Sequence, residues 1–182
     1  MAGALVAAAL IVVPARATPS KDVTTTVLTR SIFDEIHVKA HAHPADLWKA
    51  QVKTHGQSDV YVVDNKLMAG GTSGWHSHPG PSLILVVAGT VTNYLVDDPS
   101  CTPHRYTAGE GFVDPGGRHV HLLRNEASAP AKTIAVQLLP KGAPDRRIDA
   151  WDPGTCPSRR RMKGGGWASA HPPAVSRNEV IA

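Results

Sequence analysis

Hydrophobic and polar residues alternate over several short stretches of the chain, as they do in β-strands that bury one face. This alternation, together with β-branched residues, predicts strands at residues 58–68, 82–88, 90–96 and 131–139. Turn residues such as Pro79-Gly80-Pro81 separate these stretches. The pattern predicts an all-β fold built from many short antiparallel strands.

The other stretches give weaker signals. Residues 23–39 are rich in Thr, Val and Ile and predict one or two strands, and shorter strands are expected at 110–114 and 119–124. Residues 44–50 resemble a short helix that begins with proline. His41-Ala42-His43 precedes this patch, and we expect its histidines to be solvated in a loop and to bind no metal.

The chain divides into four predicted parts. Residues 1–17 resemble a signal peptide, with an apolar run followed by Ala15-Arg16-Ala17 as a cleavage pattern. Residues 18–57 hold N-terminal strands and a connecting segment, 58–150 form a barrel, and 151–182 form an arm and a disordered basic tail. The apolar run is shorter than the roughly 20 residues that span a bilayer. We therefore expect an exported protein with no stable membrane anchor; a buried N-terminal segment is the alternative.

Composition agrees with a single β-rich domain. The 182 residues include 16 Gly and 15 Pro, and only 5% are aromatic. The net charge of +4 arises mainly beyond residue 156, where five cations face one acid. Because the predicted barrel is close to neutral, we expect no nucleic-acid partner.

The two cysteines, Cys101 and Cys156, are an even count in a chain predicted to reach an oxidising compartment. We expect them to form a disulfide, and two unpaired thiols are the alternative. A metal role is not expected, because neither cysteine has a ligand-like neighbour at close spacing.

Two His-x-His pairs, His76-Ser77-His78 and His119-Val120-His121, are the main chemical signal. Residues at i and i+2 of a strand share a face, so each pair could direct two imidazoles the same way. Neutral imidazole is the commonest protein ligand for transition metals. Two such strands facing each other would form a metal pocket.

The surrounding residues resemble the cupin superfamily. Its first motif runs Gly, five residues, His-x-His, three or four residues, Glu, six residues, Gly. Gly70, His76, His78 and Gly89 occupy these positions, and Ser82 stands where the glutamate belongs.

The second motif runs Gly, five residues, Pro-x-Gly, two residues, His, three residues, Asn. Gly109, Pro115 and Gly117 match it, His121 follows one residue late, and Asn125 keeps the final spacing. The late histidine implies a bulge or a shifted register. The chain also resembles small actinobacterial-type cupins with HSHPGPS and DPGG-x-HVH runs, a group of unassigned function.

This resemblance implies an antiparallel double-stranded β-helix, the jelly-roll or cupin barrel, with the site at its mouth. His76, His78 and His121 would be the metal ligands, and the ion could be Fe, Zn, Mn, Ni or Cu. Ser82 would hydrogen-bond a bound water or a ring nitrogen, and His119 would serve as a fourth ligand or a base. Glu110 is the nearest acid in the second motif, but the spacing does not direct it at the metal.

Two functions remain open at this point. The chain could be an exported metal-dependent cupin that binds or acts on a small organic molecule. Alternatively, it could be a non-catalytic ligand-binding or structural barrel that has lost metal chemistry. The sequence does not decide whether it is an enzyme and identifies no catalytic residue. Because cupins commonly pair through their sheets, a homodimer is also expected.

Overall fold

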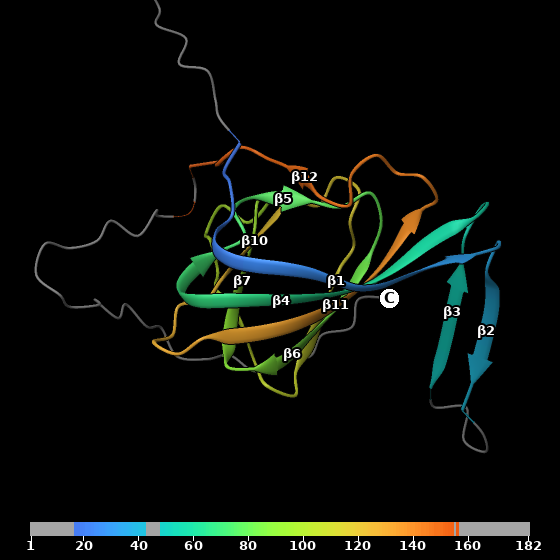
Figure 1. The fold of residues 1–182 in the computed structure, drawn as a ribbon, viewed down its shortest axis with the longest axis horizontal. Helices are drawn as coiled ribbons and strands as arrows, with labels where there is room; N and C mark the ends of the chain where they lie inside the picture. The colour runs from blue at the N-terminus through green and yellow to red at the C-terminus, as the bar shows by residue number, and fades with distance from the viewer. Residues whose placement is uncertain (1–16, 43–47, 155, 157–182) are drawn as a thin grey trace, which may run out of the picture.

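The computed structural model describes residues 17–42, 48–154 and 156, which form strands and turns and contain no helix (Figure 1). The predicted all-β class is confirmed. The strands are β1 Lys21–Phe33, β2 His37–His41, β3 Lys49–Lys53, β4 Ser58–Thr72, β5 His76–Ser77, β6 Ser82–Ala88, β7 Thr90–Leu95, β8 His104–Thr107, β9 Gly111–Asp114, β10 His121–Arg124, β11 Ala131–Pro140 and β12 Ile148–Asp149.

Ten of these strands make one antiparallel sheet that curls into a nearly closed barrel (Figure 1). The order along the sheet is β12-β5-β10-β4-β11-β6-β9, with β1 added to β4 and the pair β7–β8 added to β10. β2 and β3 form a separate hairpin that projects to one side of the barrel in Figure 1.

The N-terminal segment contributes directly to this sheet. β1 pairs with β4 from Lys21 to Phe33, so part of the 18–57 segment lies in the barrel wall. The helix expected at 44–50 is wrong at its C-terminal end, because Lys49 and Ala50 begin strand β3. Their backbones pair with β2, where Ala50 lies opposite Ala40. Residues 43–47 lie outside the described residues.

The inner face of the barrel mixes apolar and polar side chains. On β11, Ala131, Ala135 and Leu139 alternate on this buried face with Thr133 and Gln137. The largest cluster of apolar side chains packs between β4, β6, β7, β10 and β11, and consists of Leu67, Val86, Val91, Leu123 and Ala131. The buried polar residues lie beside this core and are the candidates for a functional site.

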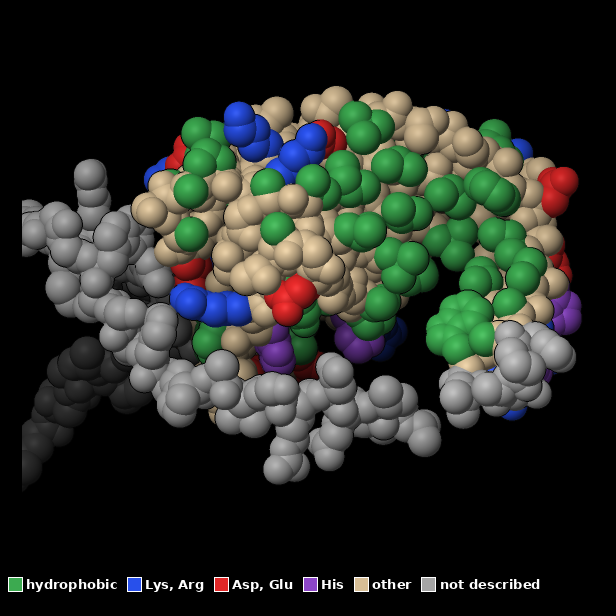
Figure 2. All heavy atoms as spheres, turned by 90° about the horizontal axis from the view of Figure 1, so that it is seen from below, with side chains coloured by type: hydrophobic (Ala, Val, Ile, Leu, Met, Phe, Trp, Pro, Cys, Tyr) green, Lys and Arg blue, Asp and Glu red, His purple; other side chains and the backbone are tan. Residues whose placement is uncertain are grey.

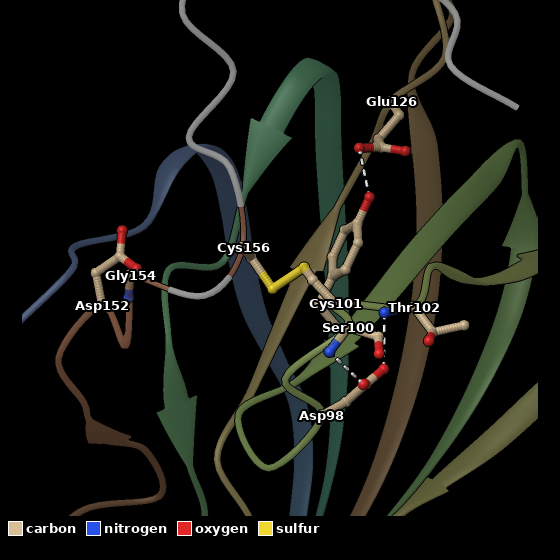
Figure 3. The surroundings of a disulfide bond; sticks show 9 residues. Asp98, Ser100, Cys101, Thr102, Glu126, Asp152, Gly154 and Cys156 are labelled. Carbon is tan, nitrogen blue, oxygen red and sulfur yellow. Dashed lines mark hydrogen bonds between the residues drawn. A yellow bond between two sulfur atoms is a disulfide. The ribbon is translucent and has the colours of Figure 1, made fainter.

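Residues 141–154 and Cys156, which follow β11, run back to the barrel through β12 and overlap the arm predicted at 151–182; we call this described segment the arm. β12 pairs with β5, and Ala150 N donates to Trp75 O at 2.9 Å. The arm ends in the predicted Cys101–Cys156 disulfide, which joins it to the loop after β7 (Figure 3). The arm is thereby held against the strands that carry the histidine motif.

Of the signal peptide predicted at residues 1–17, only Ala17 is described, and the tail predicted beyond Cys156 lies outside the described residues. No helix in the described part of the chain is long and apolar enough to cross a membrane.

Candidate metal centre

Three histidines from the two motifs meet inside the barrel. His76 lies on β5 directly opposite His121, the first residue of β10, and His78 follows β5 by one residue. Their candidate ligand nitrogens all lie within 4.8 Å of one another. The three side chains are almost completely buried, with 4 to 8% of each residue exposed.

Each imidazole makes its Nδ1 contact with a carbonyl oxygen. Because a carbonyl oxygen can only accept, the proton of each neutral ring lies on Nδ1, and Nε2 keeps a free lone pair for a metal. The contacts are His76 Nδ1 to Gly74 O at 2.9 Å, His78 Nδ1 to Arg146 O at 2.5 Å and His121 Nδ1 to Asn93 Oδ1 at 2.9 Å. The Gln137 amide nitrogen also lies 3.1 Å from His78 Nδ1, but a protonated Nδ1 cannot accept its hydrogen.

Burial keeps these histidines neutral. It lowers the pKa of His76 well below its usual range, and positive charge on His121 and Arg147 acts in the same direction. Burial also lowers the pKa of His78 and brings that of His121 to about 4, although Asp114 opposes both shifts. At neutral pH the rings are therefore in the deprotonated form that binds metals.

Asp114 supplies a carboxylate beside the histidines. Gly116 N donates to its Oδ1 at 3.0 Å, and its Oδ2 lies 3.8 Å from His78 Nε2 and 3.7 Å from His121 Nε2. Asp114 is 3% exposed and lies opposite Ser82 in the β6–β9 ladder. Residues opposite each other in a ladder share a face. The acid that the first cupin motif places at position 82 is therefore found on the neighbouring strand.

These groups fit a divalent metal ion. Among the described residues, Asp114 Oδ2 and His121 Nε2 are both buried without a hydrogen-bond partner, an arrangement that costs free energy unless a cation satisfies them. Two ligands of one tetrahedral ion with bonds of about 2.1 Å lie about 3.4 Å apart, close to the separations seen here. Ser82 Oγ also has no hydrogen-bond partner among the described residues, so of its two expected partners, a bound water or a ring nitrogen, the described residues do not supply the ring nitrogen.

His119 does not join the cluster. It is exposed, precedes β10 and is not part of a strand, so it does not share a face with His121. The extra residue of the second motif is accommodated by a turn at Gly116 and Gly117, which have φ angles of 69° and 64°. Glu110, as expected, is directed elsewhere, because its carboxylate accepts from the backbone N–H of Thr107 at 2.6 Å.

A cavity of about 130 Å³ adjoins the three histidines. Arg146 and Arg147 of the arm line it together with the histidines and Gln137. Its remaining wall is largely apolar, formed by Val23, Val63, Leu67, Ile84, Phe112, Leu123 and Ala135, with a few hydroxyl and amide groups among them.

Sequence reasoning missed Asp114, Asn93 and the arm arginines. Asp114 follows Phe112 by two residues and Asn93 follows Val91 by two, so each shares the inward face of its strand. The signal that could have identified Asp114 and Asn93 is a polar residue on the otherwise apolar inward face of a strand. Arg147 gave no such signal, because its position depends on how the arm crosses the barrel.

The cupin domain model matches residues 63–137, which include all three histidines and Asp114. Several solved structures are similar in fold. The polyketide cyclase RemF from Streptomyces resistomycificus is 14% identical with a TM-score of 0.48, and the match covers 80% of this chain and 87% of that one.

A cupin superfamily protein from Desulfitobacterium hafniense is also 14% identical, with coverage of 70% and 84% and a TM-score of 0.45. A conserved protein of unknown function from Streptococcus pyogenes is 21% identical, with coverage of 50% and 72% and a TM-score of 0.39. No curated protein matches by sequence. Residues 63–137 of the chain therefore form a cupin domain.

Proposed function

We propose that this cupin binds a divalent transition metal through His76, His78, His121 and Asp114 and receives a small organic molecule beside it. The observation that carries the proposal is the orientation of the imidazoles, each with Nδ1 held by a carbonyl oxygen and Nε2 left free. The unpartnered Asp114 Oδ2 between two of these rings adds a negatively charged donor.

The cavity beside the histidines supports binding of a small molecule. At about 130 Å³ it is smaller than the roughly 300–1,000 Å³ pockets that hold drug-sized ligands. A bound divalent ion would supply Lewis-acid polarisation to an oxygen of the guest. The chain's own contribution is to fix the donors, exclude water through its apolar wall and hold Arg146 and Arg147 at the rim.

Metal analysis of protein purified without chelators or a histidine tag tests the proposal. We expect stoichiometric metal in the native protein and its loss in His76→Ala and His121→Ala. His119→Ala is the matched control and should keep its metal, because this histidine is exposed outside the cluster. Native protein without metal that also fails to take up Zn²⁺ would contradict the proposal. Product formation from the bound molecule would separate an enzyme from a non-catalytic barrel.

We also propose that the protein is exported. The Cys101–Cys156 disulfide supports this, because such bonds persist in oxidising compartments. Detection of the mature protein outside the cytoplasm, with its N-terminus at position 18, would test it.

A homodimer is a further proposal. It is supported by exposed Leu83, Leu85 and Val87 on the outer face of β6 and Val113 on β9. Figure 2 shows hydrophobic side chains gathered on the side of the molecule seen from below. Contiguous apolar patches of this kind often mark interaction sites. Light scattering would test the dimer.

A further inference from the structure

Arg147 lines the cavity and carries a buried polar atom that no described residue satisfies. Its Nη2 is buried and has no hydrogen-bond partner among the described residues, whereas its Nε donates to Asp149 Oδ1 at 2.6 Å. Asp149 lies opposite His76 in the β12–β5 ladder, so this ion pair fixes the guanidinium beside the histidines. A buried N–H without an acceptor is costly, so binding of an acceptor to this guanidinium would be favourable.

The neighbouring arginine is already engaged. Arg146 Nη1 donates to Gln137 Oε1 at 3.0 Å, and its guanidinium lies over the Tyr61 ring at 5.3 Å from the centroid. Its backbone carbonyl meanwhile accepts from His78 Nδ1. Arg146 therefore positions the site, and Arg147 is the residue left with an unused donor.

The electrostatic setting of the cavity favours an anion. Both arginines line it, and none of the described residues that line it is Asp or Glu. Asp114 and Asp149 offset part of this charge from outside the lining.

The shape and lining of the cavity specify the kind of anion. Most of its wall is apolar, which suits an organic body rather than an inorganic ion. The planar guanidinium suits a planar carboxylate head, and because Asp149 already offsets part of its charge, a singly charged guest fits better than a dianionic phosphate. The small volume restricts the body to a few carbon atoms.

We propose that Arg147 is the anion-binding residue of a subsite for a small organic carboxylate in this cavity. The carboxylate would accept from the Arg147 guanidinium, and its carbon chain would lie against the apolar wall. The subsite rests on the proposed function, because it places the guest beside the metal donors. It adds the chemical class of the guest and the residue that selects it.

Calorimetric titration of Zn²⁺-loaded full-length protein with acetate, propionate and butyrate tests the subsite, with propionamide and sulfate as comparison probes. We expect a carboxylate to bind more tightly than either comparison probe. Arg147→Gln should weaken carboxylate binding by about 10- to 100-fold, the usual effect of losing a charge-assisted hydrogen bond. Zinc content should not change. Arg118→Gln, at an exposed arginine before β10, is the matched control and should bind as the wild type does.

Three results would overturn the subsite: no carboxylate binding by the wild type, equal binding of sulfate, or unchanged carboxylate affinity in Arg147→Gln. Loss of zinc in Arg147→Gln would also overturn it, because the residue would then act through the metal. If Arg147→Gln does not fold, Arg147→Lys replaces it and should bind carboxylate more weakly, since it cannot present the same planar donors. If the wild type takes up no zinc, the proposed function fails, and Arg147-dependent binding by the metal-free protein would still support the subsite.

Discussion

Asp114 illustrates how a carboxylate on one strand can take the place of a motif acid expected on the neighbouring strand. Ser82 and Asp114 face the same interior from adjacent strands, so the carboxylate reaches nearly the same space as an acid at position 82 would. Gly116 N holds one carboxylate oxygen and leaves the other beside His78 and His121. The three imidazoles thus have a buried carboxylate beside them, which sequence reasoning did not identify.

Asp114→Asn should separate metal binding from folding. The amide can still accept from Gly116 N, but it removes the charge beside the two imidazoles. We expect metal affinity to fall about 100-fold, while the metal-free protein melts at the same temperature or higher because a buried unpaired charge is gone. Competition with a chelator measures the affinity. Glu110→Gln, in the turn before β9, is the control; equal affinities in both variants would contradict the role of Asp114.

The metal-free protein should lose stability as the solution becomes acidic. Burial lowers the pKa of folded His121 to about 4, against about 6.5 in the unfolded chain. Above pH 6.5 both states are neutral and nothing is lost. Below it the unfolded chain gains the proton first, so stability falls between pH 6.5 and 4 by about 3 kcal/mol from His121 alone. Denaturant unfolding in a chelator measures this fall, and a flat profile over that range would contradict it.

At the scale of elements, the site depends on two turns that pack against each other. Gly116 is buried with φ of 69°, and a Cβ there would lie 2.1 Å from Gly80 O in the first-motif turn. Gly117 N donates to His78 O at 2.7 Å across the same contact. The glycines of the two motifs thus set how closely Asp114 approaches His78.

Gly116→Ala should damage stability and the metal site together. The new methyl group meets backbone in a conformation that L-residues avoid, so we expect a loss of more than about 2 kcal/mol and weaker metal binding. Gly117→Ala is a close control, because its φ of 64° is similar but no atom lies within 4 Å of the added Cβ. It should cost only about 1 kcal/mol. Equal losses in the two variants would show that strain, and not the contact between turns, is responsible.

Most strands could be predicted because side-chain alternation is a local property. The strand predicted at 82–88 coincides with β6, and the one at 131–139 is one residue shorter than β11. Alternation alone could not show whether the side chains of His119 and His121 lie on the same face. One extra residue in a glycine turn reverses the direction of the side chains that precede it. The helix expected at 44–50 failed at Lys49 because pairing with β2 outweighed local preference.

On the scale of the whole molecule, the arm completes a site that the barrel alone leaves open. It brings the Arg146 carbonyl to His78 and the Arg147 guanidinium to the cavity from positions about 70 residues beyond the first motif. Such a crossing depends on tertiary contacts that a single sequence does not encode in any local pattern. The histidines could therefore be predicted from the sequence. The groups that orient them and the arginines that add positive charge beside them could not.

Reduction of the Cys101–Cys156 disulfide should weaken both the fold and the site. The bond joins residues 55 apart, so its loss is expected to cost about 4 kcal/mol through the entropy of the unfolded chain. It also releases the end of the arm, whose Arg146 carbonyl fixes the His78 tautomer, and we expect metal affinity to fall about 10-fold. Chelator competition and denaturant unfolding of the Cys101→Ser/Cys156→Ser variant measure the two effects. A stability loss with unchanged metal affinity would show that β12 and the Ala150–Trp75 hydrogen bond hold the arm in place without the disulfide.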